Sequence, residues 1–192
     1  MLKIALIDNY DSFTYNLKHY LETDAEVTVI RNDKVVMDAL LSYDLIVLSP
    51  GPGLPKDAGK LMEVIATYYN RIPILGICLG MQAISEFFEA RLYNLKFVKH
   101  GLSSKLSWYD KEAVLYNGLT GDIQVGRYHS WAVDPESLPN HLEITARTED
   151  AIMSIVSTKY PLTGIQYHPE SILSPKGKQI LKNWLEQYKT ER

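Results

Sequence analysis

The sequence contains a single cysteine, Cys78, which limits the disulfides and metal sites that the protein can form. One cysteine cannot form an internal disulfide, and no Cys or His residues stand at the spacing of a zinc site, so we expect no metal. No run of Lys or Arg is present and the net charge is −3, which gives no electrostatic basis for binding nucleic acid or an anionic membrane. We therefore expect neither as a partner.

Long hydrophobic runs and a targeting leader are also missing. No apolar segment approaches the roughly 18 residues that a membrane span needs. The opening MLKIALID lacks the basic start and the cleavage site of a signal peptide, so we expect a cytoplasmic protein. With 192 residues, 46% of them hydrophobic, and no linker or repeat, the chain predicts a single domain over residues 1–192.

Strand-like and helix-like segments alternate through the first half of the chain. Short apolar runs predict strands at residues 2–8, 26–31, 44–49 and 72–77, and helical spacing predicts helices from residue 11 or 12 to 22 and over residues 35–41, 58–70 and 80–90. Short strands follow at residues 105–108, 113–116, 124–129, 143–147, 151–157 and 162–167, before a last helix over 176–188. This order predicts an α/β fold with a doubly wound, mostly parallel central sheet, flanking helices and a smaller antiparallel portion.

The cysteine lies between two glycines, in Gly76-Ile77-Cys78-Leu79-Gly80, where a predicted strand meets a predicted helix. With a thiol in place of a hydroxyl this is the G-x-S-x-G pattern, in which a sharp turn exposes a nucleophile and directs backbone N–H groups at the oxyanion that it creates. The helix N-terminus would favour the thiolate. A lone cysteine can also be a small buried hydrophobe, and this segment alone does not decide between the two.

A proline- and glycine-rich loop, Ser49 to Pro55 (SPGPGLP), follows the third predicted strand. Its three prolines have no N–H to donate and no Gly-Lys-Ser/Thr follows, so the loop is not expected to bind a nucleotide. It is either a rigid turn or a stiff loop that offers the amide of Gly51 or Gly53 to a substrate.

The histidine best placed to activate a thiol is His168. It leaves a strand in Gln166-Tyr167-His168-Pro169-Glu170, and Glu170 is close enough to orient its imidazole, as a catalytic base requires. The sequence therefore suggests a Cys-His-Glu triad. His19, His100 and His141 have no such carboxylate, and the cluster from Tyr128 to Trp131 either shapes a pocket or ends a strand.

Five segments together resemble the class I glutamine amidotransferases, which hydrolyse glutamine to glutamate and ammonia. They are DNYDSFTYNL (8–17), SPGPG (49–53), GICLGMQ (76–82), RYHSW (127–131) and GIQYHPES (164–171). The first segment, SPGPG and RYHS resemble most the glutaminase subunits of anthranilate synthase and of aminodeoxychorismate synthase. That resemblance implies L-glutamine as substrate, no cofactor, and a partner in the form of a separate large chorismate-binding subunit.

The resemblance also implies roles for individual residues. Cys78 would be the nucleophile, His168 the base and acid, and Glu170 the residue that orients His168. The Leu79 N–H and a glycine N–H of the SPGPG loop would form the oxyanion hole. Glutamine would be held by that loop and by further residues of the other segments, which gives the substrate set Gly51, Pro52, Gly53, Leu79, Gln82, Ser130 and Trp131.

Three positions depart from the pattern of these glutaminase subunits, and two other functions stay open. Met81 stands where they usually have histidine, Leu102 where lysine follows His-Gly, and Trp131 where they have leucine. A free-standing cysteine hydrolase of related fold would need no partner. A non-catalytic regulatory subunit would not require an intact Cys-His-Glu triad.

Overall fold

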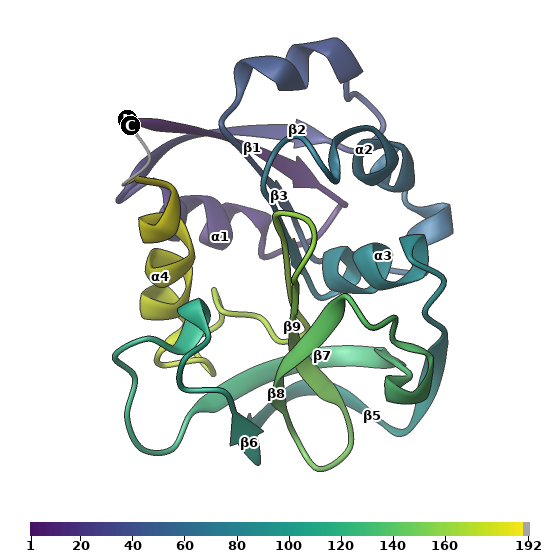
Figure 1. Cartoon of the computed structure of the whole chain (residues 1–192), viewed down its shortest axis with the longest axis vertical. Helices are drawn as coiled ribbons and strands as arrows, with labels where there is room; N and C mark the ends of the chain where they lie inside the picture. The colour runs from purple at the N-terminus through teal and green to yellow at the C-terminus, as the bar shows by residue number, and fades with distance from the viewer. Residues whose placement is uncertain (190–192) are drawn as a thin grey trace.

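An eight-stranded sheet runs through the centre of the protein (Figure 1). The structure is a computed structural model that describes residues 1–189. The sheet order is β2-β1-β3-β4-β10-β9-β8-β6. The first five strands are parallel: β2 (Ala25–Arg31), β1 (Leu2–Asp8), β3 (Leu45–Leu48), β4 (Ile74–Ile77) and β10 (Leu162–Ile165). The antiparallel strands β9 (Ile152–Ser157), β8 (Leu142–Arg147) and β6 (Trp108–Tyr109) complete it.

Helices cover both faces of this sheet, which confirms the doubly wound α/β class. In Figure 1, α1 (Thr14–Leu21) and α4 (Gly177–Lys189) lie on one side, and α2 (Leu61–Tyr68) and α3 (Leu79–Phe87) on the other. Every residue of β3, β4 and β10 is buried, as expected for parallel strands covered on both faces. Two hydrophobic clusters result: Leu17 and Trp184 belong to one, and Ile65 and Ile84 to the other.

A separate two-stranded ribbon forms the smaller antiparallel portion, along the bottom of Figure 1. It pairs β5 (Leu92–Lys105) with β7 (Gln124–Val133). The sequence predicted residues 124–129 of β7 as strand, but of β5 it predicted only the end, in the strand expected over 105–108. Most of β5 is exposed and lacks the apolar alternation that marks a half-buried strand. The β5–β7 register is also interrupted twice, between Asn94 and Lys99 and between His100 and Leu102.

The short helix expected over 35–41 is present as the 3₁₀ helix η1 (Met37–Ser42). One prediction of local structure was wrong in type: residues 113–116 were expected as a strand but contain the 3₁₀ helix η3 (Val114–Tyr116). Short apolar runs do not distinguish strand from helix by periodicity. Two further 3₁₀ turns are η2 (Pro55–Asp57) and η4 (Pro135–Ser137).

Among residues 1–189, no helix combines the length and apolar character that crossing a membrane requires.

Candidate active site

Cys78 occupies a strained turn between β4 and α3. Its φ is 52° and its ψ is −102°, in the left-handed half of conformational space that residues with a Cβ rarely adopt. The two glycines around it are sterically required: a Cβ on Gly76 would lie 2.4 Å from the carbonyl carbon of Gly80, and a Cβ on Gly80 would lie 2.7 Å from the carbonyl oxygen of Leu48. The turn therefore needs both glycines and brings the Cys78 side chain to the end of β4.

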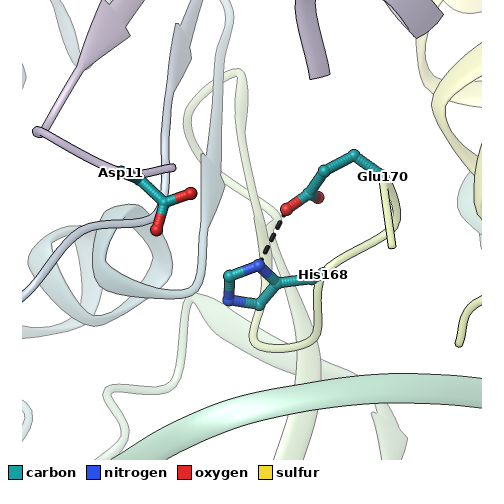
Figure 2. Close-up of side chains that lie close together, drawn as sticks. All are labelled: Asp11, His168 and Glu170. Carbon is teal, nitrogen blue, oxygen red and sulfur yellow. Dashed lines mark hydrogen bonds and ion pairs between the residues drawn. The ribbon is translucent and has the colours of Figure 1, made fainter. Parts of the chain in front are cut away.

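His168 and Glu170 form a buried, hydrogen-bonded pair in the loop after β10 (Figure 2). The Nδ1 atom of His168 lies 2.7 Å from Oε1 of Glu170, and each residue is 2% exposed. Burial lowers the pKa of His168, but its interactions with Cys78 and Glu170 outweigh burial and raise that pKa well above its usual value. Within residues 1–189, no hydrogen bond is made by Nε2 of His168, the ring nitrogen that does not face Glu170.

Aromatic rings fix the orientation of the His168 imidazole. The ring of Tyr128 lies 4.8 Å from it and that of Phe13 lies 5.8 Å away at 78°. Tyr128 is itself held by a 3.0 Å hydrogen bond between its hydroxyl and Ser171 Oγ. The contact of either ring with His168 was not predicted from the sequence, because it joins segments far apart along the chain.

Asp11 is the third charged residue at this place. Its carboxylate points toward the imidazole in Figure 2, and ligand atoms of Asp11, His168 and Glu170 lie within 4.8 Å of one another. Asp11 Oδ2 also accepts a 2.7 Å hydrogen bond from the N–H of Phe13, just before α1. The sequence predicted Asp11 or Ser12 as the helix cap. The structure places the cap at Phe13, with no side-chain hydrogen bond to the helix, so that Asp11 faces His168.

A cavity of about 130 Å³ adjoins Cys78 and collects most of the predicted substrate residues. Gly51, Pro52, Gly53, Gln82, Ser130 and Trp131 all line it, together with Tyr128 and His129. Leu79 does not line it, because its side chain is buried, but Leu79 is the first residue of α3, so its backbone N–H is at the helix N-terminus. A second cavity of about 340 Å³ reaches Cys78 and His168 from the side of residues 10–13 and His100.

The loop after β1 and the SPGPG loop after β3 are locked together beside Cys78. Asn9 donates from its backbone to Ser49 Oγ and from its side chain to Ser49 O, each at 2.8 Å. Asn32 donates to Asn9 Oδ1 at 3.0 Å. A Cβ on Gly51 would lie 2.5 Å from Asn9 O, so only glycine permits this close approach. The SPGPG loop is thus a rigid wall of the cavity.

The cluster from Tyr128 to Trp131 lies on β7 and lines the cavity, which agrees with the first of its two interpretations. Sequence reasoning gave no role to two other polar residues near the cavity, Arg127 and Gln166. Arg127 and His129 are two positions apart on β7, a spacing that puts them on one face with Trp131 and could have indicated a joint role. Burial lowers the pKa of His129 to about 4, which keeps it neutral. Burial alone would raise the pKa of Asp150, but the hydrogen bond from Arg127 outweighs it and the pKa is lowered to about 2.

Comparison with known proteins agrees with this geometry. The profile of the family described as Glutamine amidotransferase class-I matches residues 5–188. The anthranilate synthase component 2 of Cyanophora paradoxa is 47% identical over 95% of this chain and 97% of its own length. The aminodeoxychorismate synthase component 2 of Escherichia coli is 45% identical over 95% of this chain and 98% of its own length. A crystal structure of a putative GMP synthase protein from Thermoplasma acidophilum superposes with a TM-score of 0.86 at 26% identity, covering 98% of this chain and 96% of that one.

Proposed function

The chain belongs to the class I glutamine amidotransferases, and from this we propose that it is the glutaminase subunit of a chorismate-converting synthase. It hydrolyses L-glutamine to glutamate and ammonia, and a separate large subunit that binds chorismate uses the ammonia. The observation that carries the proposal is the meeting of Cys78 and the His168–Glu170 pair beside a cavity lined by the SPGPG loop, Gln82 and Trp131.

The chemistry follows from the positions of these groups. The Cys78 thiolate attacks the side-chain amide carbon of glutamine. The resulting oxyanion accepts hydrogen bonds from the N–H of Leu79, where the helix dipole is favourable, and from a glycine N–H of the SPGPG loop. His168 protonates the departing nitrogen, ammonia leaves, and a glutamyl thioester remains. The same histidine then takes a proton from water, which releases glutamate and restores the thiolate.

The remaining cavity residues hold the substrate. Gln82 contributes a side-chain amide and the Ser130–Trp131 segment of β7 contributes backbone groups, while Pro52 stiffens the loop between Gly51 and Gly53. The three residues that depart from the pattern of these subunits differ in how deeply they are buried. Met81 is fully buried, Trp131 lines the cavity, and Leu102 is 48% exposed on β5. Met81 therefore acts through packing, and only Trp131 meets glutamine.

Anthranilate, a precursor of tryptophan, is the product that we favour for the complex. Aminodeoxychorismate, a precursor of folate, is the alternative because an aminodeoxychorismate synthase component 2 matches the chain at almost the same identity. The difference between the two products arises in the large subunit, where chorismate reacts. The glutaminase chemistry is the same for both.

The test combines the purified chain with an anthranilate-forming and, separately, an aminodeoxychorismate-forming large subunit. With chorismate and glutamine, we expect product from one complex, read as anthranilate fluorescence or as aminodeoxychorismate by chromatography. Cys78→Ser should abolish synthesis from glutamine and leave synthesis from added ammonia unchanged. A diazoketone analogue of glutamine should label Cys78 once, and glutamine should block the labelling. Undiminished synthesis from glutamine in Cys78→Ser would contradict the proposal.

A further inference from the structure

A fully buried amide touches the nucleophile. Gln166, the first residue after β10, has no exposed surface, and its Nε2 lies 3.5 Å from the sulfur of Cys78. Its Oε1 accepts a 3.2 Å hydrogen bond from Nε2 of Gln82. Burying an amide is unfavourable unless its polar atoms are satisfied. Within residues 1–189, the sulfur is the acceptor that meets the Gln166 amide nitrogen.

The neighbours of Gln166 dictate which way its amide points. Gln82 Nε2 donates to the backbone carbonyl of Trp131 at 3.0 Å, and a carbonyl oxygen can only accept. The Gln82 atom that faces both Trp131 and Gln166 is therefore the nitrogen. Gln166 must then present its oxygen to Gln82 and its N–H to the sulfur of Cys78.

The carbonyl of Trp131 is fixed in turn by a chain of polar groups that ends at the surface. It accepts a 2.8 Å hydrogen bond from His129 Nδ1, and His129 Nε2 accepts a 3.1 Å bond from Arg127 Nε. Arginine has no acceptor, so the proton of neutral His129 is on Nδ1 and can only be donated to Trp131. Arg127 is held by Asp150 at 2.7 Å, and Asp150 is 40% exposed. Each bond in this chain has one possible direction.

We propose that Gln166 is a further catalytic residue, which donates its side-chain N–H to the Cys78 sulfur and stabilises the negative charge of the thiolate. A hydrogen bond to an ionised acceptor is stronger than one to a neutral acceptor, so the contact favours the thiolate over the thiol. The same donor stabilises the sulfur when the thioester breaks and the thiolate leaves. Gln166 thus acts on the nucleophile, whereas the oxyanion hole acts on the substrate.

Because Gln82 lines the substrate cavity, its bond to Gln166 also connects the wall of that cavity to the nucleophile. The inference depends on the proposed function only for the identity of the nucleophile. The contact between Gln166 and the sulfur is a property of the folded chain, and it can be measured without glutamine.

Alkylation by iodoacetamide measures this sulfur directly, because Cys78 is the chain's only cysteine. The variants are Gln166→Met, which keeps an unbranched chain without the donor, and Gln166→Glu, which replaces the amide with a carboxylate. The matched control is Gln179→Met on the exposed face of α4. Titratable groups near the sulfur are His168 with Glu170 behind it, His129 in the smaller cavity, and Tyr10, Asp11, His100 and Tyr128 in the larger one. None of these is altered in the variants.

We expect Gln166→Met to raise the midpoint of the profile of alkylation rate against pH by about one unit, so that well below both midpoints the rate falls roughly tenfold. Gln166→Glu should raise this midpoint further, because a carboxylate repels the thiolate. Gln179→Met should leave the midpoint unchanged. In the complex, kcat for glutamine hydrolysis should fall about tenfold with a smaller change in KM. A Gln166→Met variant that is folded by circular dichroism and keeps the wild-type alkylation profile would overturn the proposal.

A measurement on the unaltered chain covers the case in which the variants do not fold. The side-chain ¹H–¹⁵N signals of Gln166 should shift with pH at the midpoint found by alkylation, and the shift should vanish in Cys78→Ser. Gln166 signals that do not shift when Cys78 ionises would refute the contact. If alkylation and the amide signals follow the expectation but no glutamine is hydrolysed in the complex, the proposed function fails and the role of Gln166 at the sulfur stands.

Discussion

At the residue scale, Glu170 is the carboxylate that holds His168. Glu170 accepts from Nδ1 at 2.7 Å and contributes to the raised pKa of the imidazole. We expect Glu170→Gln to preserve the shape of the pair but to remove the charge that stabilises the imidazolium. Since this charge is needed when His168 takes a proton, kcat for glutamine hydrolysis should fall about a hundredfold or more. Steady-state kinetics of the complex measure this change.

The control for that substitution is Glu186→Gln, which removes a surface carboxylate of α4 that pairs with Lys189. It should leave kcat unchanged, because a surface ion pair contributes little and Glu186 is distant in sequence from the loop after β10. A Glu170→Gln enzyme within twofold of wild type would show that Glu170 has only a packing role.

The residues of the proposed triad could be named from sequence, but most of the contacts around them could not. Cys78 between two glycines, and His168 two positions before Glu170, are local patterns with a chemical meaning. Tyr128 and Phe13 contact the imidazole only because β7 and the segment before α1 converge on the loop after β10. Gln166 is within a motif that the sequence made visible, yet only its distance to the sulfur reveals a role.

At the element scale, the position of α3 depends on a glycine at its second residue. A Cβ on Gly80 would lie 2.7 Å from the backbone oxygen and 2.8 Å from the Cβ of Leu48 in β3. Backbone atoms cannot move aside as a side chain can, so we expect Gly80→Ala to shift α3 away from the sheet and to lower the free energy of unfolding by about 2 to 3 kcal/mol. Urea unfolding followed by circular dichroism measures the loss.

Gly118→Ala is the matched control for that change. Gly118 has φ of +72°, and a Cβ added there would have no atom within 4 Å, so the substitution meets backbone strain but no clash. It should cost about 1 kcal/mol. Equal losses in the two variants would mean that contact with Leu48 does not set the position of α3.

Regular elements were predicted well where a periodic pattern reflects burial, and poorly elsewhere. β3 and β4 are short and apolar at every position, which directly indicates strands buried on both faces. β5 has only one buried residue, Leu95, so its 14 residues present no alternation to detect. Residues 113–116 are apolar but fold into η3, because Leu115 and Tyr116 pack into the core from a turn.

At the scale of the whole molecule, the sheet topology gathers the site. The chain places β2 on one side of β1 and β3 on the other, so the direction in which strands are added to the sheet reverses between β1 and β3. Ligands in such sheets bind beyond the carboxyl ends of the strands near that point. The loops after β1, β3, β4 and β10 carry residues 9–13, the SPGPG loop, Cys78 and residues 166–170. The separate ribbon adds further residues, Tyr128 to Trp131 from β7 and His100 from β5. Predicting the doubly wound sheet therefore already predicts that these four motifs meet.

The stability of the whole fold should fall in mild acid because of His129. Burial lowers the pKa of His129 to about 4, whereas in the unfolded chain it is about 6.5, so between these values the unfolded state binds the extra proton. The stabilisation is present above about pH 6.5 and is lost as pH falls toward 4. The raised pKa of His168 has the opposite effect in a different window: its stabilisation is full below about pH 6.5 and is lost as pH rises.

The measurement is the free energy of unfolding by urea at pH 7 and pH 5, in wild type and in His129→Gln. Glutamine can accept from Arg127 and donate to Trp131 but cannot be protonated in this range. Wild type should lose about 1 to 2 kcal/mol more than His129→Gln between the two pH values. Acidic side chains with lowered pKa values, such as Asp150, stay ionised at pH 5 and cancel in the comparison. Equal losses in both proteins would show that His129 takes up its proton in the folded state, and that burial does not hold it neutral.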